Sequence, residues 1–315
     1  MNRDLSRREW IACGVAAAAG CALAPAMCAA ETDRPKDEPF GYCLNTSTIS
    51  GQNLDLVEVV EIAAKAGFQS IEPWINALDA FVRKGGNLKD LGQRIRDRGL
   101  TVESAIGFFE WIVDDPDRRA KAFEEAKRNM DLLRRIGGKR LAAPPVGATN
   151  ISNFDLLKAA ERYRALLELG DQMDVVPEAE LWGFSRTLGR IGEVMFVAIE
   201  SGHPKACILL DVFHLYKGGS NFTGLKLLGG TSMHVLHFND YPANPPRNAI
   251  SDAQRIYPGD GVAPLKNILN DLRQIGFKGV LSLELFNRDY WKQDALTVAK
   301  TGLEKMRAVV KNSFA

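Results

Sequence analysis

Three carboxylates and one imidazole occupy corresponding places in the second half of the chain, each at the end of a short apolar run. The runs end in Glu178-Ala-Glu180, Leu-Leu-Asp211, Leu-His237 and Leu-Glu284, and a loop follows each of them. Carboxylates gathered at one place repel one another and resist ionisation unless a cation lies among them. A set of oxygens completed by one imidazole suits Mn, Co, Mg, Fe or Zn and selects none of these. The residue types therefore indicate a site for one divalent metal ion.

Strand alternation decides which of the neighbouring candidates face this site. His234 and His237 point to opposite faces of a strand, and the position at the strand end favours His237, with His234 left to packing. Glu178 and Glu180 share a face, and Glu180 is preferred because it lies nearer the carboxyl end. Taken singly, a strand-end carboxylate more often caps a helix, and a lone histidine is more often a structural group. The prediction depends on the joint pattern.

The elements that must position these residues alternate between short apolar runs and longer amphipathic ones. Strands are expected over residues 40–45, 70–74, 101–106, 140–143, 175–181, 206–211, 233–237 and 279–285. Helices are expected over 54–66, 87–98, 117–136, 153–169, 185–201, 222–228, 264–275 and 295–311. Eight strand–helix units predict an α/β protein, a single-domain (β/α)8 TIM barrel over residues 40–315. In such a barrel the chemistry lies at the carboxyl ends of the strands, where the four candidates are found.

The first thirty residues have the pattern of a cleavable export signal. Arg7 and Arg8 precede an alanine-rich apolar run, and small residues at Cys28-Ala-Ala30 offer a cleavage site. The paired arginines resemble the twin-arginine signal, which predicts export of the folded protein to the periplasm. A linker, expected to be mobile, covers residues 31–39. Acylation at Cys21 is a lesser alternative, and the run is too short and too poor in large apolar residues to span a membrane.

Charge and cysteine content exclude several classes of protein. Residues 1–30 hold three arginines and two acidic residues, so the remaining chain has equal numbers of basic and acidic side chains. This balance offers no positive surface for nucleic acid or an anionic membrane. Cys43 and Cys207 are expected on distant strands and therefore unpaired. No dinucleotide or P-loop glycine pattern occurs. A small-molecule partner remains, and a homo-oligomer is left open.

The same residues carry a resemblance to the xylose-isomerase-like barrel superfamily, especially its ketose 3-epimerase, hydroxypyruvate isomerase and inosose dehydratase branches. The matching segments are Ala-Glu180-Leu-Trp, Leu-Leu-Asp211-Val-Phe-His214, Leu-His237-Phe-Asn-Asp240, Arg255-Ile-Tyr-Pro-Gly-Asp-Gly261 and Gly-Val-Leu-Ser-Leu-Glu284. The resemblance spans nearly all of residues 40–310. It implies that Glu180, Asp211, His237 and Glu284 bind one metal ion.

The resemblance also implies a reaction. A metal-dependent isomerase or epimerase would act through a cis-enediolate on an unphosphorylated ketose or a related keto-sugar, a substrate that suits an exported enzyme. Glu180 and Glu284 would reach the reacting carbon from either side, one removing a proton and the other returning one. His214 and Arg255 would bind the hydroxyl and carbonyl oxygens of the substrate.

Two departures from the family pattern concern the wall of the pocket. The 3-epimerases carry an acidic residue shortly after the strand glutamate, and Phe184-Ser185-Arg186 has none here; residues 241–254 also lengthen the interval before Arg255. These differences leave the metal site intact and put the identity of the substrate in question. Further candidates to line a sugar-sized pocket are Asn45, Glu72, Trp74, Phe108 and Trp111, of which the aromatic residues suit packing equally well.

Three other readings compete with the isomerase. A dehydratase or lyase acting on a keto-sugar or keto-glycoside would form the same enolate and then expel a β-substituent. A non-catalytic barrel that only binds carbohydrate would have lost a metal ligand, and no ligand type is missing here. The related endonuclease branch gathers three zinc ions and needs more than the four histidines of this chain.

Overall fold

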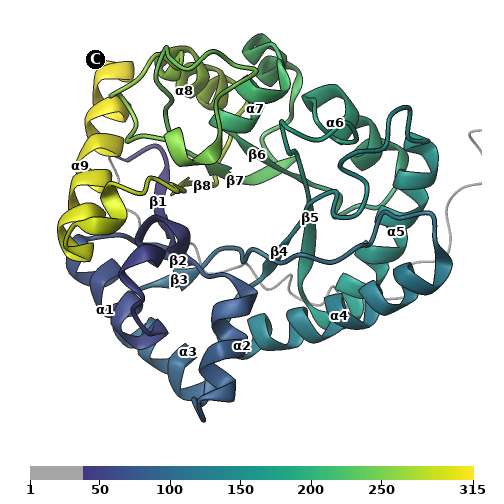
Figure 1. Cartoon of the computed structure of the whole chain (residues 1–315), viewed down its shortest axis with the longest axis horizontal. Coiled ribbons are helices and arrows are strands. Elements are labelled where there is room, and N and C mark those ends of the chain that lie inside the picture. The colour runs from purple at the N-terminus through teal and green to yellow at the C-terminus, as the bar shows by residue number, and fades with distance from the viewer. Residues whose placement is uncertain (1–37) are drawn as a thin grey trace, which may run out of the picture. The chain divides into compact units, whose positions relative to one another are not determined.

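Eight short parallel strands form one sheet that closes on itself (Figure 1). The computed structural model describes residues 38–315, so the predicted signal peptide and nearly all of the predicted linker lie outside the described residues. The strands are β1 (Gly41–Asn45), β2 (Ser70–Glu72), β3 (Thr101–Val102), β4 (Arg140–Ala143), β5 (Val176–Glu180), β6 (Ile208–Asp211), β7 (Met233–His237) and β8 (Val280–Leu283). Their order is β3-β2-β1-β8-β7-β6-β5-β4.

The residues that follow β3 join the two ends of this sheet. The amide of Ala105 donates to the carbonyl of Arg140 over 3.1 Å, and the amide of Ala142 donates to the carbonyl of Ala105 over 2.9 Å. These bonds connect the β3 segment to β4, so within residues 38–315 neither end of the sheet is left as an open edge. The predicted TIM-barrel-like fold is confirmed, with its eight parallel strands in one domain.

Helices surround the strands on the outside, as Figure 1 shows. They are α1 (Leu56–Ala66), α2 (Ile75–Arg83), α3 (Leu88–Asp97), α4 (Pro116–Arg135), α5 (Leu156–Met173), α6 (Ile191–Glu200), α7 (Val212–Gly218), α8 (Leu265–Gln274) and α9 (Ala295–Phe314). Helix α1 illustrates how the sequence sets their ends. Asp55 and Glu58 form a reciprocal capping box at its start, and Gly67 ends it with a φ of 93°.

Two apolar cores stabilise the fold, one outside the ring of strands and one inside it. The larger one lies between the strands and the surrounding helices and includes most of the buried aliphatic side chains. A smaller cluster contains Cys43, Ile106, Ala142, Leu209, Val235 and Val280, contributed by inward-facing positions of the strands. Cys43 and Cys207 are both buried and unpaired, as expected. Among the described residues, no helix is long and apolar enough to cross a bilayer.

Three helical segments differ from the sequence-based expectation. Helix α2 was not expected, and α7 was expected to be a loop. Helix α2 begins at Ile75, shortly after β2, and α7 begins at Val212, directly after β6. Helix α6 begins at Ile191 instead of residue 185. The Ser185 hydroxyl bonds the backbone of Thr187, and Leu188 has a φ of 54°, so the chain turns here before the helix begins. Residues 182–190 are therefore a loop at the mouth of the barrel.

Candidate active site

Strand register brings the predicted residues to one level of the barrel. Asp211 on β6 is paired with His237 on β7, and His237 is paired with Ser282 on β8. On the other side of β8, Asn45 of β1 is paired with Glu72 of β2. Since these strands are parallel and end together, their last inward-facing side chains meet at the carboxyl end of the barrel.

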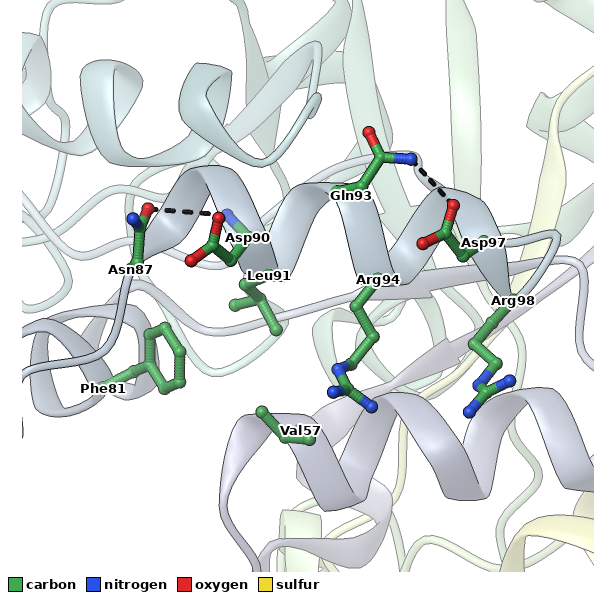
Figure 2. Close-up of a pocket in the computed structure, with 9 residues that line it drawn as sticks. All are labelled: Val57, Phe81, Asn87, Asp90, Leu91, Gln93, Arg94, Asp97 and Arg98. Atoms are coloured by element: carbon green, nitrogen blue, oxygen red, sulfur yellow. Dashed lines mark hydrogen bonds between the residues drawn. The ribbon is translucent and has the colours of Figure 1, made fainter.

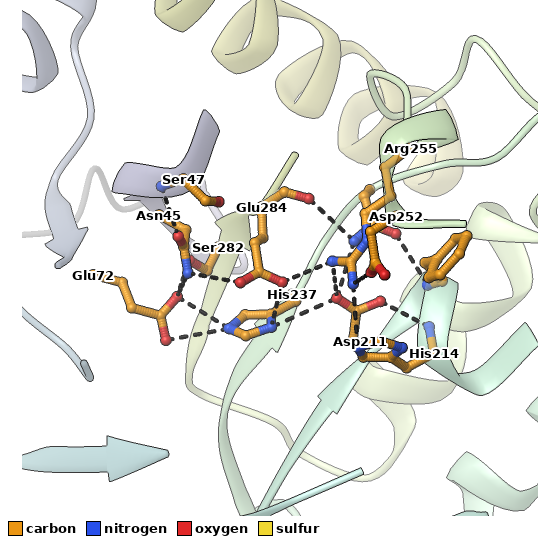
Figure 3. Close-up of polar contacts among 12 residues, drawn as sticks. Asn45, Ser47, Glu72, Asp211, His214, His237, Asp252, Arg255, Ser282 and Glu284 are labelled. Carbon is orange, nitrogen blue, oxygen red and sulfur yellow. Dashed lines mark hydrogen bonds and ion pairs between the residues drawn. The ribbon is translucent and has the colours of Figure 1, made fainter. Parts of the chain in front are cut away.

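Asp211, His237 and Glu284 form a buried cluster with the composition of a metal site (Figure 3). One ligand atom from each lies within 4.8 Å of the other two. His237 Nδ1 is 3.1 Å from Glu284 Oε2 and 3.5 Å from Asp211 Oδ2. Atoms that each lie about 2.0–2.2 Å from one shared ion are themselves roughly 3.0–3.6 Å apart, so this spacing fits a divalent metal.

The two ring nitrogens of His237 have different surroundings. Nε2 lies 3.1 and 3.2 Å from the two carboxylate oxygens of Glu72, whereas Nδ1 makes no hydrogen bond although two carboxylates are close. A metal-binding histidine typically gives its second nitrogen to a carboxylate in this way, which fixes the tautomer and the ring orientation. Burial lowers the pKa of His237, but Glu284 and Glu72 outweigh that effect and hold it well above its ordinary value.

Glu72 is itself held by two further side chains. Ser282 Oγ donates to its Oε2 over 2.7 Å and Asn45 Nδ2 donates to the same oxygen over 2.9 Å. Asn45 also donates to Glu284 over 3.2 Å and accepts a bond from the indole of Trp74. Asn45 and Glu72 are fully buried, so they support the cluster from behind and do not line the open pocket.

Asp211 serves two purposes with its two carboxylate oxygens. Oδ1 accepts the amide of His214 over 2.9 Å and thereby caps the start of α7. Oδ2 faces the cluster and also accepts from Asn239, whose own oxygen accepts the amide of Phe213. A strand-end aspartate can cap a helix or bind a metal ion, and here Oδ1 caps α7 while Oδ2 remains directed at the cluster.

Arg255 lies deep in the site, with 1% of its surface exposed. Its Nη1 is 2.7 Å from Asp211 Oδ2 and 2.7 Å from Glu284 Oε2, and its Nη2 is 2.5 Å from Asp252. Burial raises the pKa of Asp211, but Arg255 and the two histidines outweigh it, so this pKa lies well below its ordinary range. The guanidinium is therefore the main neighbour that favours the ionised form of Asp211.

Glu180 faces the cavity beside this cluster without belonging to the group of three. Its side chain is almost fully buried, and Oε2 has no hydrogen-bond partner. Burial raises the pKa of Glu180 to about 8, despite the opposing effect of His237. A carboxyl group with this pKa is suited to accept and release a proton near neutral pH.

The mouth of the barrel contains a cavity of about 410 Å³. Of the four predicted metal ligands, Glu180 and Glu284 line it, and so do His214 and Arg255. Trp74 and Phe108 line it as predicted, together with Trp182, Phe184, Phe286 and Trp291, which were not predicted to line the pocket.

Trp111 does not line the cavity. It is fully buried, donates its indole N–H to the carbonyls of Ala143 and Pro144, and packs against Tyr163. The expectation that Trp111 lines the pocket is corrected, because the indole belongs to the core.

Some contributors to the site were missed for physical reasons. Asp252 lies in the inserted stretch before Arg255, and Ser282 and Asn239 are small polar residues with no distinctive spacing. Their roles depend on contacts between strands far apart in the sequence. The only available signal was position, since Ser282 lies two residues before Glu284 and Asn239 two after His237.

A wider groove of about 580 Å³ lies on the outer helices, away from the strand ends (Figure 2). Val57 of α1, Phe81 of α2 and the exposed side of α3 line it. Arg94 and Arg98 there both pair with Glu61, and Gln93 donates to Asp97. The groove is a solvated surface in which Arg94, Arg98 and Asp97 already have partners, and its lining residues do not converge on a ligand.

The chain is similar in sequence and in fold to known proteins. Residues 60–309 match the family model of the xylose isomerase-like TIM barrel. The chain is 28% identical to an inosose isomerase from Bacillus velezensis over 279 residues, covering 86% of this chain and 98% of that protein. It is 24% identical to a 3-dehydroshikimate dehydratase from Pseudomonas putida over 266 residues, covering 83% of this chain and 40% of that protein. The crystal structure of the IOLI protein with a bound zinc atom has a TM-score of 0.80 at 22% identity, covering 87% of this chain and 99% of that one.

Proposed function

Because the chain belongs to the xylose isomerase-like TIM barrel family, we propose that it is a metal-dependent isomerase or epimerase of an unphosphorylated keto-sugar. One observation carries the proposal. Of the four residues expected at the metal, Glu180 and Glu284 also line the cavity, where they can reach a bound substrate. Asp211 and His237 are buried behind them and suit a purely ligating role.

The donor set fits a divalent metal, held by Asp211, His237 and Glu284 with Glu180 as the fourth ligand. The unpartnered His237 Nδ1 and Glu180 Oε2 support this assignment, because buried polar atoms rarely lack a partner. When bound, the ion would supply Lewis-acid stabilisation of the negative charge that develops on the substrate oxygens. The bound zinc of the IOLI protein makes zinc one candidate, beside Mn, Co, Mg and Fe.

The protein residues divide the proton transfer between them. One glutamate removes the proton from the carbon next to the carbonyl, leaving an enediolate, and the other returns a proton to give the isomer or epimer. His214 and Arg255 both line the cavity, and each has a buried nitrogen, Nδ1 and Nε respectively, without a partner within the protein. These two side chains are suited to hydrogen-bond the hydroxyl and carbonyl oxygens of the sugar.

A dehydratase or lyase is the second candidate, and the similarity to the 3-dehydroshikimate dehydratase favours it. The same proton would be removed, and the electron pair would then expel a β-substituent, which leaves with a proton from the second glutamate. The retained metal-donor set argues against a barrel that only binds carbohydrate.

The experiment that tests the proposal is deuterium exchange in heavy water with a panel of ketoses and keto-glycosides. Exchange at the carbon next to the carbonyl without loss of water or aglycone supports isomerisation, and loss of either supports the lyase. Glu284→Gln is expected to abolish exchange while the barrel stays folded. If no divalent metal alters either exchange or thermal stability, the proposal is wrong.

We further propose that the protein is exported to the periplasm. The paired arginines at positions 7 and 8 motivate this proposal. Cell fractionation of the wild type and of a variant with both arginines replaced by lysine tests it. Equal retention of both proteins in the cytoplasm would contradict export.

A further inference from the structure

An unbroken series of aromatic contacts covers one wall of the cavity. Trp74 contacts Phe286 and Phe108 at ring-centroid distances of 5.9 and 5.3 Å, and Phe108 contacts Trp182 at 5.9 Å. Trp182 contacts Phe184 at 5.1 Å, and Phe184 contacts the ring of His214 at 5.7 Å. All six rings line the cavity, and we call them the aromatic arc.

The outer part of the aromatic arc is exposed although it is apolar. Phe108 is 42% exposed and Phe184 is 50% exposed, whereas the inner members Trp74 and Phe286 are half-buried. Exposed aromatic side chains gathered at one site mark a surface that binds something. The polar side chains of Ser251, Asp252, Arg255 and Arg288 also line the cavity, and the guanidinium of Arg255 lies 5.0 Å from the centroid of the Phe286 ring. The cavity therefore offers a ligand both apolar and polar surface.

The loop that carries Trp182 and Phe184 is held in place. The amide of Trp182 donates to Leu188, and the amide of Arg186 donates to Thr149. Gly183 lies so close to α7 that a Cβ there would be 2.2 Å from the carbonyl oxygen of His214. Any side chain at this position would push the loop away from the helix. The backbone that carries the two rings is consequently held in place, which lowers the entropy lost in ordering the loop on binding.

The cavity is large enough to hold a second part of a ligand beside the reacting sugar. Glu180 and Glu284 mark the inner end, where the reacting sugar carbon must lie. The volume of about 410 Å³ falls within the roughly 300–1,000 Å³ typical of sites for drug-sized ligands. Space bounded by Phe108, Trp182 and Phe184 remains toward the solvent, beyond the acidic end.

We propose that the aromatic arc is a subsite for a second ring attached to the reacting sugar. This inference rests on the proposed function for the position of the sugar itself. The substrate is then a glycoside with a flat apolar face next to the keto-sugar, which is either an aryl aglycone or the apolar face of a second sugar. Phe184 and Trp182 contact that ring and determine specificity, while the metal site acts on the first ring.

A binding experiment tests this without requiring turnover. The dissociation constants of methyl and phenyl β-pyranosides and of a β-linked disaccharide, each in the gluco, galacto and xylo series, are measured by calorimetry on the full chain supplied with Mn. We expect at least one two-ring probe to bind about tenfold more tightly than the matched methyl glycoside. Preference for the phenyl probe identifies an aryl aglycone, and preference for the disaccharide identifies a second sugar.

Variants show whether the aromatic arc causes the preference. Phe184→Ala is expected to reduce the tenfold preference to about twofold or less, and Phe184→Leu, which retains an apolar side chain without a ring, to reduce it in part. Phe196→Ala is the matched control, since Phe196 is a 38% exposed phenylalanine on α6 that does not line the cavity. Equal affinity for one-ring and two-ring probes, a preference that survives Phe184→Ala, or no binding by any probe overturns the inference. Ring preference without deuterium exchange on any substrate would instead count against the proposed function.

Discussion

Glu72 holds His237 by the ring nitrogen that faces away from the other two members of the cluster, with Nε2 at 3.1 Å from Oε2. The two residues lie on β2 and β7, 165 positions apart in the chain. Burial raises the pKa of Glu72, but the charge of His237 and bonds from His237, Ser282 and Asn45 outweigh it, so the net shift is downward. Glu72 is therefore an ionised acceptor that keeps Nδ1 of His237 turned toward the place of the ion.

Replacing Glu72 tests this arrangement directly. Glu72→Gln is expected to weaken binding of Mn or Zn by about 10- to 100-fold, because the orientation and basicity of His237 depend on its carboxylate partner. Calorimetric titration of the chelated protein measures the affinity. Glu103→Gln is the control, since Glu103 is a partly buried carboxylate near β2 and β3 with an Arg140 partner. Unchanged affinity in Glu72→Gln would show that His237 is oriented by other contacts.

The Glu180→Gln variant is expected to lose proton transfer without losing stability. The pKa of about 8 means that this carboxyl is mostly protonated at pH 7 in the metal-free protein, and glutamine has nearly the same shape without the charge. We expect isotope exchange to fall by about 10²- to 10⁴-fold, while the free energy of unfolding in chelator changes by less than about 1 kcal/mol. Exchange measurements and urea unfolding provide the two values. Exchange at the wild-type rate would remove Glu180 from the reaction.

Much of the site could be located from strand ends alone, since Glu180, Asp211 and His237 are the last residues of their strands and Glu284 directly follows β8. Asp211 and His237 are even paired in the sheet, as their equivalent positions suggest. Position alone could not show which atoms face each other. Glu72 was expected on the pocket wall, yet its side chain turns to His237 across the barrel, and only the barrel geometry determines that.

The pocket wall was harder to predict than the metal cluster. A helix was expected from residue 185, because apolar residues recur at helical spacing, but local bonds of Ser185 and Thr187 turn the chain there. The resulting loop carries Phe184 into the cavity. Asp252 likewise lies in an insertion with no strong pattern, and its contact with Arg255 depends on how that insertion folds back. Trp111 was a candidate for the pocket wall as an aromatic residue near the strand ends, but its side chain is buried in the core.

Arg255→Gln is expected to destabilise the metal-free protein more than the metal-bound protein. Removing the guanidinium leaves Asp211 and Glu284 buried without their cation, which costs about 3–5 kcal/mol of unfolding free energy. A divalent metal would neutralise the same two carboxylates and recover part of that loss. Urea unfolding in chelator and in excess Mn measures both states, with Arg288→Gln at the exposed rim as control. Equal destabilisation in the two conditions would contradict this account.

His234 provides a test away from the site, on the face of β7 opposite to His237. Burial, followed by the charge of Arg140, lowers the pKa of His234 to about 4. The unfolded chain, with an ordinary histidine pKa near 6.5, binds the proton more readily, so stability is fully present above about pH 6.5 and is lost as the pH falls toward 4. His234→Gln cannot take up that proton. We expect the variant to lose about 1–2 kcal/mol less than the wild type between pH 7 and pH 4.5, after allowance for the partial exposure of the ring. Urea unfolding of both proteins across this range in chelator measures the difference. Identical acid dependence of the two proteins would show that the pKa of His234 is the same in the folded and unfolded states.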